Sequence, residues 1–191
     1  MHKGRPRFGF FIFDCPSDHE VDGSLPTESD VIRGVLANRK NLKSRIKVIK
    51  CSTAKRFRSL RKKRYIGIRY VHVGGHGSKK GLGFIGGTVK WPKVAKKLTT
   101  LFPQLEDGEE RILTLSCCYS EQGIAAMKQI LQGHFSAAYH FVPDEIGFSK
   151  AITTWSMFYH KKGLKDPREA IRDKINDFMD EKVIRFVLIK S

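Results

Sequence analysis

Short apolar runs alternate with amphipathic stretches along most of the chain. Runs rich in aromatic and β-branched residues predict strands, whereas apolar positions spaced three or four residues apart predict helices. We expect strands at 8–13, 45–51, 65–73, 111–116, 135–142 and 183–189, and helices at 27–40, 53–64, 91–102, 120–132, 148–159 and from about 166 onward.

Strands that alternate with helices predict a mostly parallel sheet with helices on both faces. The length of 191 residues suits one domain that spans 1–191. We therefore predict an α/β fold, a three-layer αβα sandwich. The second and last strands alternate charged and apolar residues, which favours positions near the sheet edges. The glycine-rich stretch 78–87 lacks the GxxxxGK[ST] pattern of a phosphate-binding loop, so a hairpin is expected there.

Two of the predicted strands end at residues that can do chemistry. The third strand runs into Gly75-His76-Gly77, and the fourth runs into Cys117-Cys118. The carboxyl ends of parallel strands share one edge of a sheet. If these strands are neighbours, an imidazole and a thiol therefore meet in one crevice.

A thiol with its ordinary pKa of about 8.5 needs a base or a positive environment to become a nucleophile. His76 can supply the base, and the backbone N–H of Gly77 is a candidate oxyanion donor. A helix that begins near Ser120 adds a positive dipole worth up to about 1 kcal/mol. His72 precedes His76 on the same strand and is expected to be a buried, hydrogen-bonded core residue.

The charge balance is strongly basic, with 36 Lys and Arg against 19 Asp and Glu and a formal charge of +17. Such a charge favours acidic proteins or nucleic acid as partners. Basic side chains are densest at 55–64, where only Phe57 and Leu60 are apolar. This stretch is either a solvated helix face or a contact surface for an acidic partner.

The four cysteines have no CxxC spacing, and two of them are adjacent. That arrangement suits neither a zinc site nor a disulfide framework, and His134, His140 and His160 show no metal-binding spacing. We expect no metal and no cofactor. No run approaches the roughly 18 apolar residues of a membrane span, so the expected protein is soluble and cytoplasmic, with free thiols.

Three sequence blocks resemble the caspase-like cysteine peptidases, and most closely their CHAT domains. Residues 71–77 (VHVGGHG) look like the family's His-Gly block, and 115–118 (LSCC) look like Leu-Ser-Ala-Cys with Cys117 in place of Ala. Phe158-Tyr159, Gly163 and Glu169-Ala170 resemble the CHAT ending. The resemblance implies a caspase-like fold and hydrolysis of polypeptides by a dyad, without a metal.

Within that resemblance His76 is the acid and base, and Cys118 is the nucleophile. A shift of one residue would make Cys117 the nucleophile instead. Family members that cut after basic residues hold an acidic residue on the loop that corresponds to 142–147, which makes Asp144 a candidate pocket residue. Asp14, at the end of the first strand, is a second candidate at the crevice edge. Two other functions stay open. One is a non-catalytic domain that binds nucleic acid or an acidic protein through its basic surface, and the other is a hydrolase or transferase that uses the same thiol on a non-peptide acyl group. The oligomeric state is open as well.

Overall fold

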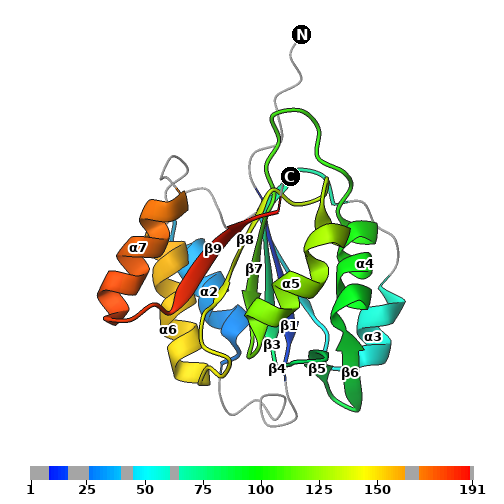
Figure 1. Ribbon diagram of the computed structural model, residues 1–191, viewed down its shortest axis with the longest axis horizontal. Helices are drawn as coiled ribbons and strands as arrows, with labels where there is room; N and C mark the ends of the chain where they lie inside the picture. Colours follow the sequence, from blue (N-terminus) through cyan, green and yellow to red (C-terminus); the bar gives the residue numbers. More distant parts are fainter. Residues whose placement is uncertain (1–8, 17–25, 40–44, 61–64, 162–167, 190–191) are drawn as a thin grey trace.

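The predicted sandwich is present in the computed structural model, which describes residues 9–16, 26–39, 45–60, 65–161 and 168–189. Six strands form one sheet in the order β2-β1-β3-β7-β8-β9, and a second, small sheet has the order β4-β5-β6. All neighbours in the large sheet are parallel except β8 and β9, which are antiparallel. Figure 1 shows this sheet between two groups of helices.

The elements follow the predicted alternation. The strands are β1 (Gly9–Cys15), β2 (Ile46–Lys50), β3 (Ile68–Gly75), β4 (Gly77–Ser78), β5 (Gly81–Phe84), β6 (Gly87–Lys90), β7 (Ile112–Ser116), β8 (Ala137–Phe141) and β9 (Ile184–Leu188). The helices are α2 (Glu28–Ala37), α3 (Ala54–Ser59), α4 (Trp91–Leu101), α5 (Ser120–Leu131), α6 (Phe148–Lys161) and α7 (Arg168–Met179).

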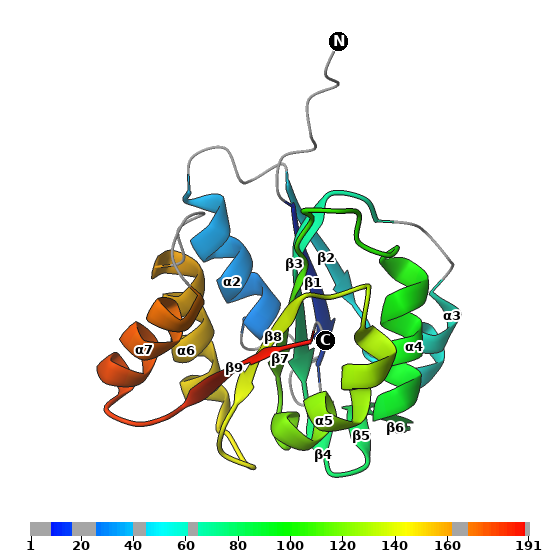
Figure 2. The same cartoon turned by 45° about the horizontal axis from the view of Figure 1, so that its top comes forward.

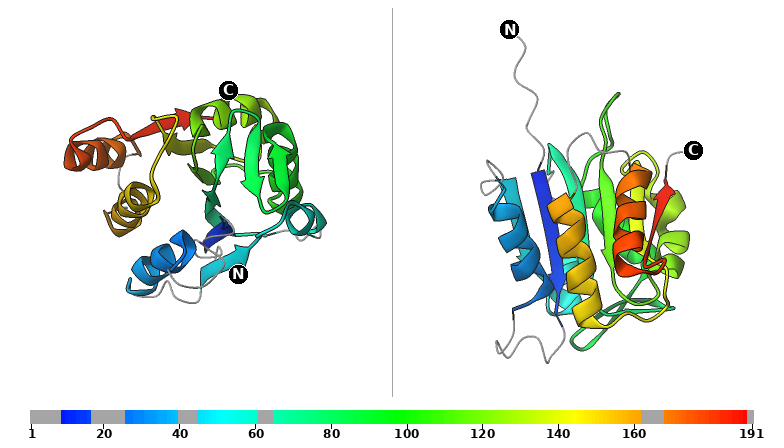
Figure 3. Two further views of the ribbon diagram at one scale, coloured as in Figure 1. Left: turned by 90° about the horizontal axis from the view of Figure 1, so that it is seen from below. Right: turned by 90° about the vertical axis from the view of Figure 1, so that its left-hand side faces the viewer.

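The large sheet is buried on both faces, so its central strands supply two separate apolar cores. In β1, Phe11 and Phe13 point into the core beneath α3, α4 and α5, whereas Phe10 and Ile12 point into the core beneath α2, α6 and α7. Figure 3 shows the two helical layers from below, with the sheet between them. Burial on both sides explains why β1 is an unbroken apolar run rather than an alternating one.

The predicted edge strands lie at the edges. β2 and β9 are the first and last strands of the large sheet, and each carries exposed basic side chains. On β2 these are Lys47 and Lys50, and on β9 it is Arg185. The predicted neighbours, now β3 and β7, pair directly, with His72 opposite Thr114 and Gly74 opposite Ser116.

Two of the predicted boundaries were wrong. The strand predicted at 65–73 is β3, which begins only at Ile68 because Ile66 and Gly67 form a turn in which Gly67 has a φ of +75°. The helix predicted at 53–64 is the short α3, because the backbone of Leu60 leaves the helical region with a ψ of 118°. The predicted helix start at Asp166 and Pro167 lies outside the described residues, as do Arg61 to Arg64.

The predicted starts of α2 and α4 and the predicted hairpin are present in the structure. Thr27 precedes α2 and forms a capping box with Asp30, and Pro92 stands in the first turn of α4. The predicted glycine-rich hairpin is formed by β5 and β6. None of the described helices is long and apolar enough to cross a lipid bilayer.

Candidate functional site

The strand register brings the predicted histidine and cysteines to the same place. Gly74 at the end of β3 pairs with Ser116 at the end of β7. His76 and Cys118 each lie two residues beyond this pair, at the carboxyl edge of neighbouring parallel strands. His76 is exposed and Cys118 is partly exposed. The strand register therefore brings both residues to the same edge of the sheet.

Gly77 brings the turn after β3 into contact with the turn after β7. A β-carbon on Gly77 would overlap the carbonyl oxygen of Cys118 and would lie 2.9 Å from the sulfur of Cys117. Real β-carbons essentially never approach other atoms this closely. Glycine is thus needed here for a close approach between two backbones, and the close approach joins the His76 turn to the cysteine turn.

The two adjacent cysteines have different surroundings. Cys117 is 2% exposed and packs in the core beneath α3, α4 and α5. Burial raises the pKa of its thiol well above the ordinary value, and the nearby Cys118 and Glu28 raise it further. Cys118 is partly exposed and lies before the first turn of α5. Of the two thiols, Cys118 is the one that solvent and a ligand can reach.

The loop between β8 and α6 holds the Cys118 sulfur. The N–H of Ile146 donates to this sulfur at 3.5 Å, and the thiol can donate to the carbonyl of Ile146 at 3.8 Å. The backbone of Ile146 therefore positions the sulfur through both its N–H and its carbonyl group.

Tyr119, directly after Cys118, is fixed by the same loop. Its φ of +54° lies in the left-handed region, which bulky residues seldom adopt. The N–H of Tyr119 donates to the carbonyl of Asp144 at 2.6 Å, and its hydroxyl donates to Glu145 at 3.3 Å. These bonds hold a strained residue next to the accessible thiol, as is common at functional sites.

Asp144, a predicted pocket residue, is exposed on this loop. Its side chain accepts a hydrogen bond from the amide of Gln122 at 2.8 Å, so Asp144 links the β8 to α6 loop to α5. The acidic side chains of Asp144 and Glu145 thus lie beside Tyr119, and the ammonium of Lys79 lies 5.8 Å from the Tyr119 ring centre.

The second predicted pocket residue, Asp14, is buried instead of open to solvent. It is 4% exposed, and its carboxylate accepts a hydrogen bond from Ser29 of α2 at 2.6 Å. Burial raises the pKa of Asp14 above its ordinary value, although the Ser29 hydroxyl opposes this shift. Asp14 therefore anchors the start of α2 to the end of β1.

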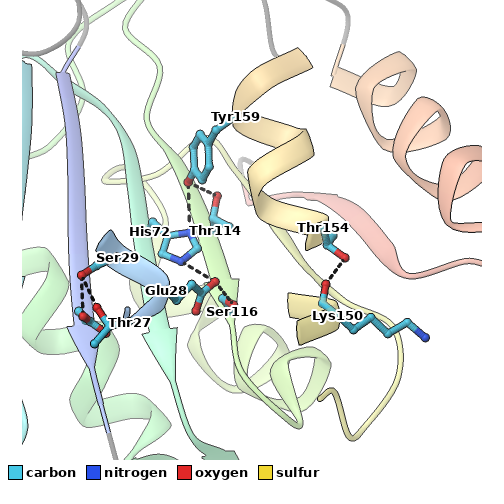
Figure 4. A network of polar contacts seen from close by, with 10 residues as sticks. Thr27, Glu28, Ser29, His72, Thr114, Ser116, Lys150, Thr154 and Tyr159 are labelled. Atoms are coloured by element: carbon cyan, nitrogen blue, oxygen red, sulfur yellow. Dashed lines mark hydrogen bonds and ion pairs between the residues drawn. The ribbon is translucent and has the colours of Figure 1, made fainter. Parts of the chain in front are cut away.

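A buried polar network lies below the two strand ends (Figure 4). Glu28, the first residue of α2, accepts a hydrogen bond from the Ser116 hydroxyl at 2.6 Å. The same carboxylate oxygen lies 3.2 Å from Nε2 of His72, without the angle of a good hydrogen bond. Nδ1 of His72 is 3.2 Å from the hydroxyl of Tyr159, which donates to Thr114 at 3.4 Å.

Glu28 touches both strands that carry the site. Its other oxygen lies over Gly74, where a β-carbon would come within 2.6 Å. Gly74 and Ser116 are each two residues before His76 and Cys118, respectively. A single carboxylate from α2 thus holds together the ends of β3 and β7. The prediction that His72 is a buried, hydrogen-bonded core residue is confirmed, since it is 1% exposed.

The N–H of Gly77 is not used by the small sheet. The N–H of Gly83 donates to the carbonyl of His76 at 2.7 Å, which makes Gly77 and Leu82 a non-hydrogen-bonded pair of the antiparallel ladder. In such a pair the N–H groups point away from the partner strand. This leaves the Gly77 N–H outside the ladder, as its predicted role as an oxyanion donor requires.

Cysteine, histidine and carboxylate groups do not gather into a metal site in the described part of the chain, where no cluster of three could hold an ion. Comparison with models of known protein families finds none that matches this chain, and comparison with curated proteins finds no significant match. What the site does must therefore follow from its own geometry and chemistry.

Several residues of the site carry no recognisable signal in the sequence. Glu28 was expected only as part of a helix start, and the backbone of Ile146 has no signature at all. Tyr159 belongs to an apolar helix pattern, so its hydroxyl bond to His72 is a result of tertiary packing. A polar residue within an apolar strand, such as His72 or Thr114, is the one signal that could have pointed to the buried network.

Proposed function

We propose that this protein is a cysteine endopeptidase that hydrolyses polypeptides through a dyad of His76 and Cys118. The observation that carries this proposal is the contact of Gly77 with Cys118, combined with the accessibility of the Cys118 thiol alone of the adjacent pair. The sequence resemblance to caspase-like peptidases names the same two residues.

In this reaction the Cys118 thiolate attacks the carbonyl carbon of the scissile peptide bond. The oxygen of that carbonyl becomes an oxyanion, for which the N–H of Gly77 is a donor. His76 gives a proton to the leaving amine, and an acyl-enzyme remains on the sulfur. A water molecule, deprotonated by His76, then hydrolyses the thioester and restores the thiol.

Two features of the site surround the Cys118 sulfur. The Ile146 N–H donates to the sulfur, and α5 begins two residues later with its positive end toward Cys118. All four cysteines are free thiols. We infer that the protein works in a reducing compartment, the cytoplasm, where such thiols persist.

An electrophilic peptide ketone tests this proposal, with labelling measured by intact mass. We expect labelling of the unaltered protein and of Cys117→Ala, and none of Cys118→Ala. His76→Ala should label much more slowly, while His160→Ala, which removes an exposed histidine from α6, should label normally. Labelling that disappears only in Cys117→Ala would move the nucleophile to Cys117. Labelling at the same rate in His76→Ala would remove His76 from the mechanism.

A further inference from the structure

The excess of positive over negative charge lies in one continuous part of the chain. Residues 31–105 contain 21 Lys and Arg and no Asp or Glu. The rest of the chain carries 15 basic against 19 acidic residues. The formal charge of +17 therefore comes entirely from this segment, and the remainder of the protein is slightly acidic.

Much of this segment folds into neighbouring elements of one layer. The ammonium of Lys97 on α4 donates to the carbonyls of Arg58 and Leu60 at the end of α3, at 2.6 and 3.0 Å. The ring of Phe57 on α3 packs 5.1 Å from that of Phe84 on β5. The helices α3 and α4 and the β5 to β6 hairpin thus form one surface unit, which is visible together in Figure 2.

Six exposed basic side chains lie on this unit, and we call them the basic face: Lys55, Arg56, Arg58, Lys90, Lys93 and Lys96. Some basic residues elsewhere form ion pairs, as Lys50 does with Asp30 and Arg69 with Glu110. Within the described residues, no carboxylate forms an ion pair with a member of the basic face. Six like charges are therefore presented to solvent without internal compensation.

We propose that the basic face binds the phosphate backbone of a double-stranded nucleic acid. Interfaces with nucleic acid are far more positive than protein interfaces, in which Lys is depleted. Single strands are bound by stacking bases on exposed aromatic rings. The aromatic residues of this unit do not offer such a platform, since Trp91 and Phe57 are each 1% exposed and Phe84 is partly buried against the core. Lysine contacts to phosphate carry little sequence information, so binding is largely independent of sequence.

Fluorescence anisotropy with a labelled 20-base-pair duplex tests this inference. The protein carries Cys118→Ala, so that the result does not depend on peptidase activity. Binding should weaken with salt, with a slope of about −0.9 in log K against log salt for each phosphate contacted. The triple variant Lys55→Gln, Lys93→Gln, Lys96→Gln should make that slope shallower by up to about three. We expect its affinity at 0.15 M salt to fall about tenfold or more.

The matched control is Lys161→Gln, Lys174→Gln, Lys182→Gln, which removes three exposed charges from α6, α7 and the turn after α7. It should bind the duplex nearly as well as the parent. An equal loss of duplex affinity in the two triple variants would show that binding depends on net charge alone, and would overturn the basic face as the binding site. Tighter binding of polyglutamate, of a single-stranded oligonucleotide or of anionic vesicles than of the duplex at equal salt would overturn the choice of ligand.

Discussion

Gly77 lies so close to Cys118 that any side chain on Gly77 would overlap the Cys118 carbonyl oxygen. The turn after β3 and the turn after β7 therefore pack against each other without room for a side chain between them. This contact connects the turn of an exposed histidine to the turn of an accessible thiol, although 41 residues lie between His76 and Cys118 in the chain.

Replacing Gly77 with alanine should separate the two turns. The added methyl group forces a backbone shift, and overpacking of this kind costs about 1–3 kcal/mol. We expect Gly77→Ala to lower the free energy of unfolding by about that amount and to slow labelling of Cys118 by a peptide electrophile. Urea denaturation and intact-mass kinetics measure the two effects.

Gly34→Ala is the matched control, since a β-carbon at Gly34 meets no atom within 4 Å and this residue lies inside α2. Alanine is a better helix former than glycine, so this variant should be up to about 1 kcal/mol more stable. If Gly77→Ala proves as stable and as reactive as the parent, the close approach of the two turns is not needed for the site.

The four thiols should differ sharply in their reaction with a small alkylating agent. Burial raises the pKa of Cys15 and of Cys117 well above the ordinary value, and raises that of Cys51 to about 11. At pH 8 these three remain protonated and covered, so iodoacetamide should modify one equivalent per chain, at Cys118. Peptide mapping identifies the residue, and unfolding in urea should expose all four. Early modification of Cys117 in the folded protein would contradict the assignment.

Removing the carboxylate of Glu28 should weaken both strand ends. Glu28→Ala leaves the Ser116 hydroxyl and the His72 ring without their buried partner, which costs about 2–4 kcal/mol by analogy with other buried pairs. Glu106→Ala, at an exposed carboxylate, should change stability by less than about 0.5 kcal/mol.

A double-mutant cycle between Glu28 and His72 separates their interaction from general destabilisation. Contacting residues in a buried network show coupling energies of about 0.5–3 kcal/mol. We expect the effects of Glu28→Ala and His72→Ala to be less than additive. Strict additivity would mean that the 3.2 Å approach of the two side chains contributes nothing to stability.

Asp14 should make folding less favourable as the pH rises. Burial raises its pKa in the folded state above the unfolded value of 3.8. The folded state therefore prefers the protonated form of Asp14. The free energy of unfolding falls as the pH rises through the folded pKa, because Asp14 must then ionise in a buried position. Asp14→Asn keeps an oxygen for the Ser29 hydroxyl, so it should stabilise the protein more at pH 7 than at pH 4. Thermal unfolding of the parent and of Asp14→Asn at pH 4 and at pH 7 measures the change in stability. An equal change at the two pH values would contradict the raised pKa.

Much of the fold could be predicted because it depends on local pattern. Short runs rich in aromatic and branched apolar residues, such as 8–13 and 111–116, are typical of buried strands. Pro92 and Thr27 mark helix starts through their own chemistry. The errors arose where local and tertiary preferences differ. The basic stretch 53–64 was expected to be helical throughout, but α3 ends at Ser59 because the backbone of Leu60 leaves the helical region.

The site could be predicted only in part, for a related reason. His76 and Cys118 stand at strand ends, and the end of a parallel strand is a position that pattern alone reveals. The surrounding partners come from distant segments. The backbone of Ile146, from the loop after β8, holds the Cys118 sulfur, whereas Glu28 of α2 and Tyr159 of α6 bond to Ser116 and His72 on the two strands. Such contacts depend on packing between layers, which leaves no periodic trace in the chain. Asp14 looked like a crevice residue because the packing of α2 over it is likewise invisible in the sequence.

The two edge strands have a consequence for the behaviour of the protein in concentrated solution. An edge of a sheet offers unpaired backbone groups to any other strand, and natural proteins prevent such pairing with charged side chains. β2 carries Lys47 and Lys50, and β9 carries Arg185, which forms an ion pair with Glu121. Lys50 is paired with Asp30, so Lys47 is the lysine that two copies would bring together if they met at their β2 edges. The charge of Lys47 thus opposes edge-to-edge association at β2.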